Sequence, residues 1–285
     1  MEKLIVNKKY NNKKLDKFVL DNLPYLSSNT FYKLLRKKDI KINNIRISQN
    51  INVNLYDEVS IYVPFDLKKE FYKLDILYED KNILIVNKPI NLEVVGINSL
   101  TDKVHKHYES NEFKPMPCHR IDRNTTGLVL FAKSQDSLNI LKEKFKNHEI
   151  KKHYKALVYG IPKNKFARLE SYLFKDSQKS MVYISDSFKK GYKKIVTIYN
   201  VLETYDNNSS LLDVEIETGR THQIRAHLAH IGLPIIGDGK YGINSVNKQF
   251  GVKQQQLCHY MLKFKFTTDS GILDYLSNKT FQVNK

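Results

Sequence analysis

Residues 119–133 place a carboxylate where it could do chemistry. They read His-Arg-Ile-Asp-Arg-Asn-Thr-Thr-Gly-Leu-Val-Leu-Phe-Ala-Lys, so Asp122 stands between Arg120 and Arg123 just before an apolar run. The apolar run at 127–132 predicts a buried strand. Packing alone rarely puts a carboxylate between two arginines at the end of such a strand. A carboxylate held there can attack a substrate as a nucleophile or remove a proton, and the residue types do not distinguish the two roles.

A second polar motif occupies residues 217–228, which read Glu-Thr-Gly-Arg-Thr-His-Gln-Ile-Arg-Ala-His-Leu. The pattern predicts a helix that Thr221 caps and that ends at Gly232. Three aliphatic side chains are expected on its buried side: Ile224, Leu228 and Ile231. Arg220 and His222 stand at its start and fit two interpretations, as groups that bind a substrate or as structural caps. Backbone N–H groups at such a helix start can also hold a phosphate.

These motifs need a scaffold in which strands and helices alternate irregularly. One helix is expected after Ser134, which is a suitable N-cap. Because no regular βαβ period emerges, we expect an α+β fold on a mixed or largely antiparallel sheet, over residues 77–285. Its strands are predicted at 83–87, 127–132, 154–159, 195–202, 212–217 and 261–266.

The residue pattern of the first part of the chain predicts a separate small unit over residues 1–64. Apolar residues at helical spacing indicate one helix and then a second over 30–38. Two short alternating runs around an Asn43-Asn44 turn predict a hairpin, and a further strand follows. Residues 65–76 are charged and lack Gly and Ser, so they predict a stiff connector between the two units.

The composition favours a polyanionic partner and a reducing compartment. The formal net charge is +17 over 285 residues, which attracts phosphates and releases their counterions. The cysteines are Cys118 and Cys258, and the chain has neither a signal-like apolar start nor a run of about 18 apolar residues. We therefore expect a cytosolic protein with reduced thiols. The cysteines and histidines fit no common closed zinc spacing, and a phosphate loop at 232–237 is rejected because Asp238 stands where lysine is required.

Four ordered motifs resemble the catalytic domain of the RluA-like pseudouridine synthases. Besides residues 119–133 and 217–228, they are Val-Asn-Lys-Pro at 86–89 and His-Tyr-Lys-Ala-Leu-Val-Tyr-Gly at 153–160. The chain departs from the family after the first of these motifs, where Gly-Leu-x-Val-His is replaced by Asn-Leu-Glu-Val-Val at 91–95. This difference concerns a loop expected near the RNA rather than the chemistry.

The resemblance implies an enzyme that isomerises uridines in RNA, and it assigns roles to individual residues. Asp122 would be the catalytic carboxylate, with Arg225 as its buried cationic partner, because desolvation disfavours an isolated carboxylate. Tyr154 would stack on a uracil flipped out of the RNA, and Arg120 would help to displace that base or clamp a phosphate. Arg123 is either a further RNA contact or a solvated charge. No cofactor and no metal are implied, since the isomerisation is redox-neutral.

The small first unit resembles the S4 RNA-binding domain in its order of two helices and short strands. The resemblance rests on residues 34–44, and the S4 family usually has glycine near Lys38 and at Asn44. It implies RNA binding by three basic side chains of the second helix: Lys33, Arg36 and Lys37. S4-bearing members typically act on large-subunit ribosomal RNA, which is therefore the expected partner of a monomeric enzyme. Transfer RNA as the substrate, and a non-catalytic RNA-binding or ribosome-assembly factor, stay open as alternatives.

Overall fold

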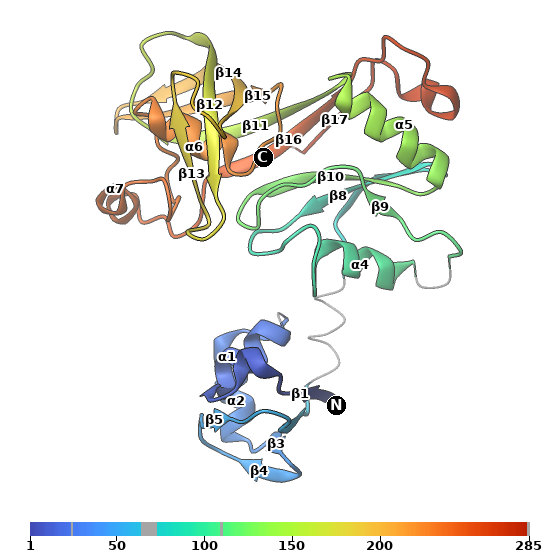
Figure 1. Ribbon diagram of the computed structural model, residues 1–285, viewed down its shortest axis with the longest axis vertical. Coiled ribbons are helices and arrows are strands. Elements are labelled where there is room, and N and C mark those ends of the chain that lie inside the picture. The colour runs from blue at the N-terminus through green and yellow to red at the C-terminus, as the bar shows by residue number, and fades with distance from the viewer. Residues whose placement is uncertain (24, 64–72, 109–110, 284–285) are drawn as a thin grey trace. The chain divides into compact units, whose positions relative to one another are not determined.

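The chain consists of two compact units, Met1–Leu74 and Asp75–Lys285 (Figure 1). The connector predicted at 65–76 falls mostly on residues 64–72, which lie outside the described residues. The computed structural model describes residues 1–23, 25–63, 73–108 and 111–283.

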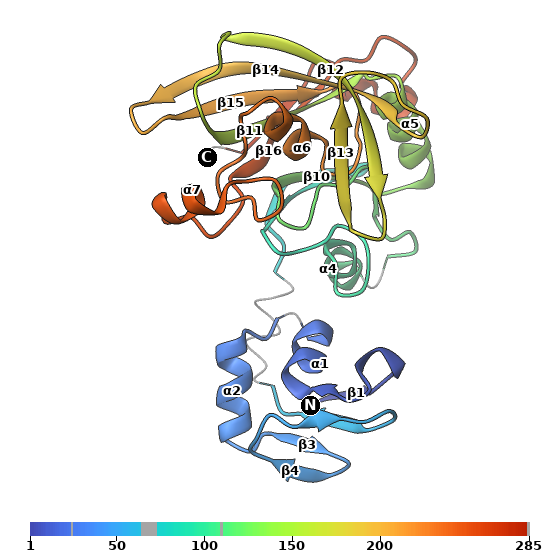
Figure 2. The same ribbon diagram turned by 60° about the vertical axis from the view of Figure 1, so that its left-hand side comes forward.

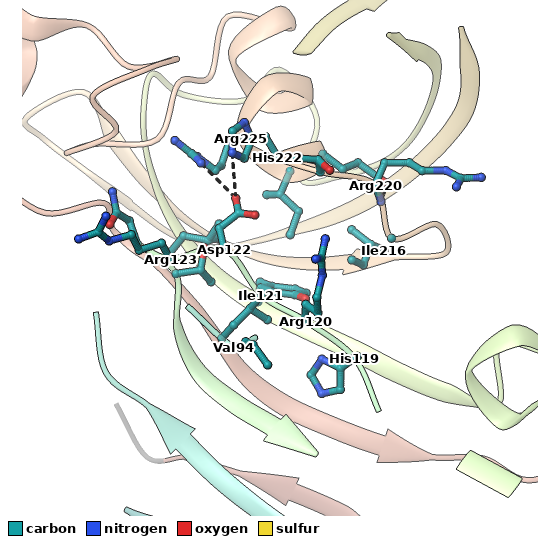
Figure 3. Close-up of a pocket in the computed structure, with 18 of the residues that line it drawn as sticks. Val94, His119, Arg120, Ile121, Asp122, Arg123, Ile216, Arg220, His222 and Arg225 are labelled. Atoms are coloured by element: carbon teal, nitrogen blue, oxygen red, sulfur yellow. Dashed lines mark hydrogen bonds and ion pairs between the residues drawn. The ribbon is translucent and has the colours of Figure 1, made fainter. Parts of the chain in front are cut away.

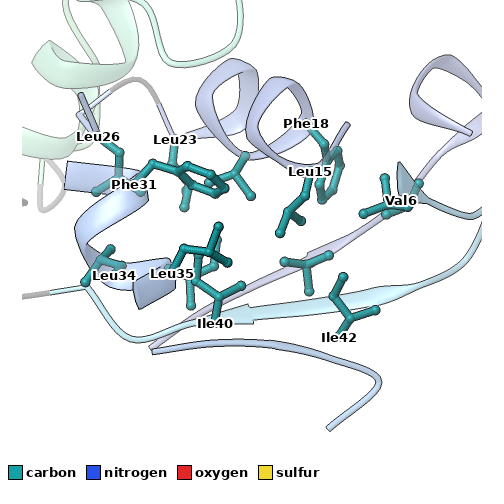
Figure 4. Close-up of a cluster of buried hydrophobic side chains, with 14 of the residues drawn as sticks. Val6, Leu15, Phe18, Leu23, Leu26, Phe31, Leu34, Leu35, Ile40 and Ile42 are labelled. Carbon is teal, nitrogen blue, oxygen red and sulfur yellow. The ribbon is translucent and has the colours of Figure 1, made fainter. Parts of the chain in front are cut away.

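The first unit is an antiparallel sheet with two helices packed on it. The helices are α1 (Leu15–Asn22) and α2 (Ser28–Arg36). The sheet follows the order β1 (Glu2–Ile5), β6 (Glu58–Ile61), β3 (Ile40–Ile42) and β4 (Ile45–Ile47). Shorter elements are η1 (Lys8–Tyr10) and the paired strands β2 (Lys13–Lys14) and β5 (Asn52–Val53). Figure 4 shows the apolar side chains between helices and sheet, including Leu15, Phe18, Phe31, Leu35 and Ile40.

The turn chemistry of this unit is as predicted, but the second helix ends early. Asn43 and Asn44 form the hairpin turn with φ of +49° and +67°. The pattern extends the helix to Lys38, whereas α2 ends at Arg36 because Lys38 adopts a left-handed conformation with φ of +58°. The next N–H, of Asp39, then turns back to an unpaired helical carbonyl. Lys38 therefore holds a backbone position that glycine adopts without strain.

The second unit is built on one eleven-stranded sheet. Its strands are β7 (Ile76–Glu79), β8 (Ile83–Lys88), β9 (Met116–Pro117), β10 (Thr126–Ala132), β11 (Ile150–Tyr159), β12 (Phe166–Asp176), β13 (Met181–Ser185), β14 (Lys193–Tyr205), β15 (Ser209–Ile216), β16 (Leu257–Phe264) and β17 (Thr280–Gln282). The main path runs β13-β12-β14-β15-β11-β16-β10-β8-β7, with β17 paired to β16 and β9 to β10. Among the described strands, only β10 and β16 pair in parallel. The sheet is thus mixed and largely antiparallel, as predicted.

Helices pack against both ends of this sheet (Figure 2). They are α4 (Leu100–His107), α5 (Gln135–Lys146), α6 (Gln223–His230), α7 (Asn244–Gln249) and the 3-10 helix η2 (Gly271–Leu276). Ser134 caps α5 as predicted, since its side chain accepts the N–H of Ser137 at 3.1 Å. α5 packs on β10, and α6 packs on β13 and β14. None of the helices in the described ranges is long and apolar enough to cross a membrane.

β10 and β16 approach each other unusually closely at Gly127. This glycine has φ of +108°, and a Cβ added to it would lie 2.1 Å from the carbonyl oxygen of His259. Only glycine fits such an approach of two backbones. The contact brings the strand that follows Asp122 beside the strand that carries His259.

A buried ion pair joins α5 to Glu149, just before β11, and hydrogen bonds connect the pair to the segment after β16. Lys144 Nζ lies 2.9 Å from Glu149 Oε2, and both side chains are almost completely buried. Glu149 also accepts hydrogen bonds from the hydroxyl of Thr268 at 2.7 Å and the N–H of Thr267 at 3.0 Å. Burial raises the pKa of Glu149, but these hydrogen bonds outweigh it and hold the pKa at about 2. The pair is fully satisfied and stabilises the fold rather than forming a second site.

Candidate active site

A cavity of about 760 Å³ opens between the segment that leads into β10, the start of β11 and the segment that leads into α6. Six lysine and arginine side chains and only two carboxylates line the cavity, so its electrostatic potential is positive and favours a polyanionic ligand. The predicted residues that line it are Arg120, Asp122, Arg123, Tyr154, Arg220, His222 and Arg225. The other three predicted RNA contacts belong to the first unit, where they are exposed on or just after α2: Lys33, Arg36 and Lys37.

Two carboxylates share Arg225, and Figure 3 shows the one that faces the cavity, Asp122. Arg225 Nη1 donates to Asp122 Oδ2 at 3.1 Å, and Arg225 Nε and Nη2 donate to the two oxygens of Asp238 at 2.7 and 2.9 Å. Burial lowers the pKa of Arg225, but Asp238 and Asp122 outweigh it and the pKa is raised. Asp238 is completely buried, whereas the Asp122 side chain is 26% exposed. The bidentate pair therefore fixes the plane of the guanidinium, whose remaining N–H orients the carboxylate that faces the cavity.

His222 approaches the same carboxylate from the N-terminal end of α6. Its Nε2 lies 4.0 Å from Asp122 Oδ2, and its Nδ1 lies 2.9 Å from the hydroxyl of Tyr241. Burial lowers the pKa of His222, and the charge of Asp122 opposes this effect. His222 occupies the N-cap position with φ of +52°, but its side chain makes no capping hydrogen bond. Its ring is a group of the cavity and not a cap.

The prediction that Thr221 caps α6 is wrong. The helix begins at Gln223, whose buried side-chain oxygen accepts the N–H of Arg220 at 3.1 Å and the hydroxyl of Thr218 at 2.8 Å. The Gln223 amide donates to β14, which holds the residue in place, and the N-cap residue His222 makes no side-chain capping hydrogen bond. Ile231 was expected on the buried side but is 37% exposed, because the helix ends one residue before it.

A buried lysine fixes the backbone around Asp122. Lys88 Nζ donates to the carbonyls of Pro89, Leu92 and Arg123 at 2.9, 2.7 and 3.1 Å. Burial lowers the pKa of Lys88 to about 7, and the charge of Asp122 opposes the shift. The three carbonyls belong to the two loops that border the cavity. Lys88 therefore links β8 to both loops and fixes the position of the loop that carries Asp122.

Tyr154 is a flat, neutral wall of the cavity. Its ring stacks on His259 with centroids 4.6 Å apart and an angle of 23° between the planes. His259 donates from Nδ1 to the carbonyl of Leu128 at 2.6 Å, and burial lowers its pKa to about 3, so the imidazole is neutral. Burial also raises the pKa of Tyr154, which keeps its hydroxyl protonated. The imidazole thus supports the tyrosine ring from one face.

The three remaining arginines stand where the cavity opens to solvent. Arg120, Arg123 and Arg220 are exposed although they line the cavity. Arg123 Nε donates to the carbonyl of Asn91 at 3.4 Å, in the loop that departs from the RluA-like pattern. Their charged groups are therefore accessible to a large anionic ligand.

Two supporting residues of the site were not identified from the sequence. Asp238 lies in Gly-Asp-Gly-Lys-Tyr, a segment that resembles the family, and this resemblance was the available signal. Lys88 ends an apolar strand, where a lysine is unusual and indicates a buried hydrogen-bonding role. Within the described ranges, no three His, Cys, Asp or Glu side chains gather in a way that could hold a metal ion.

Comparison with known proteins decides the family. Residues 82–230, over half of the chain, match the family model described as RNA pseudouridylate synthase. The chain belongs to this family. It is therefore an RNA pseudouridine synthase, an isomerase, and the resemblance to RluA-like enzymes is confirmed.

Relatives and solved structures agree with this assignment. The enzyme is 34% identical to ribosomal large subunit pseudouridine synthase C of Buchnera aphidicola subsp. Acyrthosiphon pisum, over 86% of this chain and 82% of the relative. It is 33% identical to the protein of the same name in Rickettsia felis, over 80% and 81% of the two chains. The structure of human RNA pseudouridylate synthase domain containing 4 superposes with a TM-score of 0.60 at 22% identity, over 73% of this chain and 87% of that one. That similarity shows a shared fold.

Proposed function

We propose that this synthase converts uridine to pseudouridine in large-subunit ribosomal RNA and that Asp122 starts the reaction. The observation that carries the proposal is the carboxylate of Asp122, which faces a cationic cavity and is held at 3.1 Å by Arg225. The relatives from Buchnera and Rickettsia support the choice of RNA, because their names state the large ribosomal subunit. A cytosolic location and a monomeric state stay predictions.

The chemistry requires the target uridine to leave its stack and enter the cavity. Asp122 then attacks C1′ of the ribose, or removes the proton at C2′. On either route the C1′–N1 bond breaks and the uracil departs with the bonding electron pair. The detached base turns, a bond forms between C5 and C1′, and C5 loses its hydrogen as a proton.

The other groups of the cavity have supporting roles in this proposal. Arg225 neutralises Asp122 in a partly desolvated site and fixes its direction. Tyr154 offers a ring on which the uracil stacks, and His259 keeps that ring in place. Arg120 and Arg220, at the exposed opening, hold the RNA backbone and fill the position that the flipped base leaves.

We infer that the first unit docks RNA as an S4-like domain. The support is its order of elements and its two left-handed residues: Lys38 and Asn44 take positive φ at the positions where S4 domains usually have glycine. The exposed basic side chains at the end of α2 would neutralise phosphates. They are Lys33, Arg36 and Lys37.

The first experiment measures tritium release from RNA labelled at uridine C5, on bulk ribosomal and transfer RNA separately. We expect release from ribosomal RNA by the wild type and none by Asp122→Asn, which keeps the shape of the side chain but removes its charge. Asp136→Asn, at an exposed position in the first turn of α5, is the matched control and should be fully active. Full activity of Asp122→Asn would refute the assigned role. Release from transfer RNA alone would overturn the proposed substrate.

A second experiment tests the first unit by the salt dependence of RNA binding. Replacing Lys33, Arg36 and Lys37 together by Ala should weaken binding and make the slope of log K against log salt shallower, because fewer counterions are released. The matched control removes three other exposed charges of the same unit: Lys8, Lys13 and Lys17. Equal effects of the two triple variants would show that α2 is not a specific docking surface.

A further inference from the structure

Neither lysine that lines the cavity pairs with a carboxylate in the described part of the chain, but Lys240 donates to the carbonyl of Ser180 at 2.7 Å. Lys152, on β11, lines the cavity with Tyr154, and in the described part of the chain it forms no ion pair. Its Nζ lies 5.4 Å from the ring centre of Phe145, and a carbon added at Gly219 would lie 3.5 Å from it. Burial lowers the pKa of Lys152. Lys152 is partly buried, and an ammonium without a counter-charge is unfavourable there, so a site that keeps one is a candidate for binding negative charge.

Lys152 lies at the end of the cavity away from Arg225. Burial lowers the pKa of His119 and His259, and the charge of Lys152 adds to this effect. Burial also lowers the pKa of His222, on which Asp122 and Arg225 are the main charges. Figure 3 shows His119 on the side of the cavity opposite Arg225. Tyr154 lies between the two ends. Its ring stacks on His259, and its pKa is raised by burial and by the charge of Asp122.

The reaction creates negative charge at this end. When the C1′–N1 bond breaks, N1 keeps both electrons, and the charge spreads over O2 and O4 of the uracil. We propose that Lys152 is a catalytic residue that donates a hydrogen bond to one of these oxygens and stabilises the detached uracil anion. This inference rests on the proposed function. Lys152 keeps its proton throughout, and the charge that Asp122 gives up reappears on the base, so the step is balanced.

The position of Lys152 on its strand favours the base over the RNA backbone. Lys152 and Tyr154 are two residues apart on β11, and both line the cavity although the pairing of β11 with β16 shifts register between His153 and Tyr154. A uracil stacked on Tyr154 therefore points one edge toward Lys152. The phosphates stay near the opening, where Arg120 and Arg220 are exposed.

The test compares two leaving groups. Lys152→Met keeps the length of the side chain and removes its charge. Single-turnover consumption of the starting nucleoside is measured by chromatography and mass spectrometry after digestion, on large-subunit RNA transcripts made with uridine or with 5-fluorouridine. The product from 5-fluorouridine keeps fluorine at C5 and, because no proton can leave there, takes up water at C6 instead. Fluorine withdraws electrons and stabilises the uracil anion, so less help from the protein is needed. We expect Lys152→Met to slow uridine conversion by about 100- to 1000-fold, the usual effect of losing one donor to a developing anion, and to slow 5-fluorouridine conversion at least tenfold less.

Three controls separate this role from others. Lys155→Met, on the same strand but outside the cavity, should convert both transcripts at wild-type rates. RNA affinity and its salt slope should be unchanged in Lys152→Met, and its melting temperature should not fall, because an unpaired, partly buried charge is removed.

Each other outcome overturns the inference. An equal loss on both transcripts means that Lys152 only positions its neighbours. Weaker binding with a shallower salt slope means that it binds a phosphate. A wild type that converts neither transcript refutes the proposed function itself, whereas a wild type that converts both while the variant behaves normally refutes only the role of Lys152.

Discussion

The ion pair between Asp238 and Arg225 allows a sharp test of how the cavity is organised. Asp238→Asn keeps the shape of the side chain but removes the charge that faces a buried guanidinium at 2.7 and 2.9 Å. One amide N–H of the new side chain would also point at an N–H of Arg225, donor against donor. The partner that remains, Asp122, is partly exposed and offers only one hydrogen bond. Removing one member of such a buried pair costs about 3–5 kcal/mol.

This loss should be visible in thermal unfolding. For a unit of this size, 1 kcal/mol shifts the melting temperature by about 2–4 °C, so Asp238→Asn should melt about 6–20 °C below the wild type. Turnover measured well below that temperature should fall too, because the guanidinium no longer holds Asp122 in a fixed direction. The assays are calorimetry and tritium release on the same preparations.

A double variant shows whether the uncompensated charge is the cause. Asp238→Asn combined with Arg225→Met removes the stranded guanidinium, so it should be more stable than Asp238→Asn alone. The reasoning is refuted if Asp238→Asn melts within about 2 °C of the wild type, the shift expected of less than 1 kcal/mol. It is also refuted if the double variant is the less stable of the two.

Three further changes test other parts of the fold. Glu149→Gln should destabilise the protein by about 3–5 kcal/mol at neutral pH, because it leaves Lys144 buried without a counter-charge. The difference should shrink as the pH falls from about 4.3 toward 2, since a carboxylate with a depressed pKa loses its contribution between its unfolded and folded pKa values. Gly127→Ala should cost about 2–5 kcal/mol in denaturant unfolding, because its Cβ would meet the His259 carbonyl oxygen. Lys38→Gly should stabilise the first unit by about 0.5–1 kcal/mol, because it relieves a left-handed lysine.

Each of these changes has an outcome that contradicts its reasoning. A Glu149→Gln effect that is the same at neutral and acidic pH would mean that charge is not the cause. An unchanged unfolding midpoint for Gly127→Ala would mean that β10 and β16 can separate without loss. A destabilised Lys38→Gly variant would mean that the lysine side chain contributes more than its strained backbone costs.

The parts of the site that stand in motifs can be predicted from the sequence, and their supports cannot. Asp122, Tyr154 and Arg225 each lie in a dense polar motif, so their convergence in one cavity is expected. Asp238 lies between glycines, and nothing local indicates that it points at Arg225 rather than at solvent. The contact depends on how the segment after α6 folds back, which is a tertiary property.

Local sequence patterns predict some helix starts and strands correctly and others wrongly, and the reasons can be identified in the structure. Ser134 caps α5 because the capping hydrogen bond needs only neighbouring residues. α6 begins at Gln223 without a side-chain cap, and β14 holds the Gln223 amide, a contact that no local rule includes. The hairpin of β12 and β13 lies at one end of the sheet and exposes residues on both faces, so its apolar alternation is too weak to predict.

The place of β16 in the sheet makes the appearance of activity a late event in folding. Asp122 precedes β10, whereas Tyr154 lies on β11 and Arg225 follows the strands beyond it, and β16 is inserted between β10 and β11. This strand begins at Leu257, far along the chain from β10 and β11, so the two halves of the site can be joined only after residue 257 has been made. The early strands must stay apart, with their edges unpaired, until it arrives. A chain that ends before β16 therefore lacks the strand that joins Asp122 to Tyr154 and Arg225, and it should release no tritium.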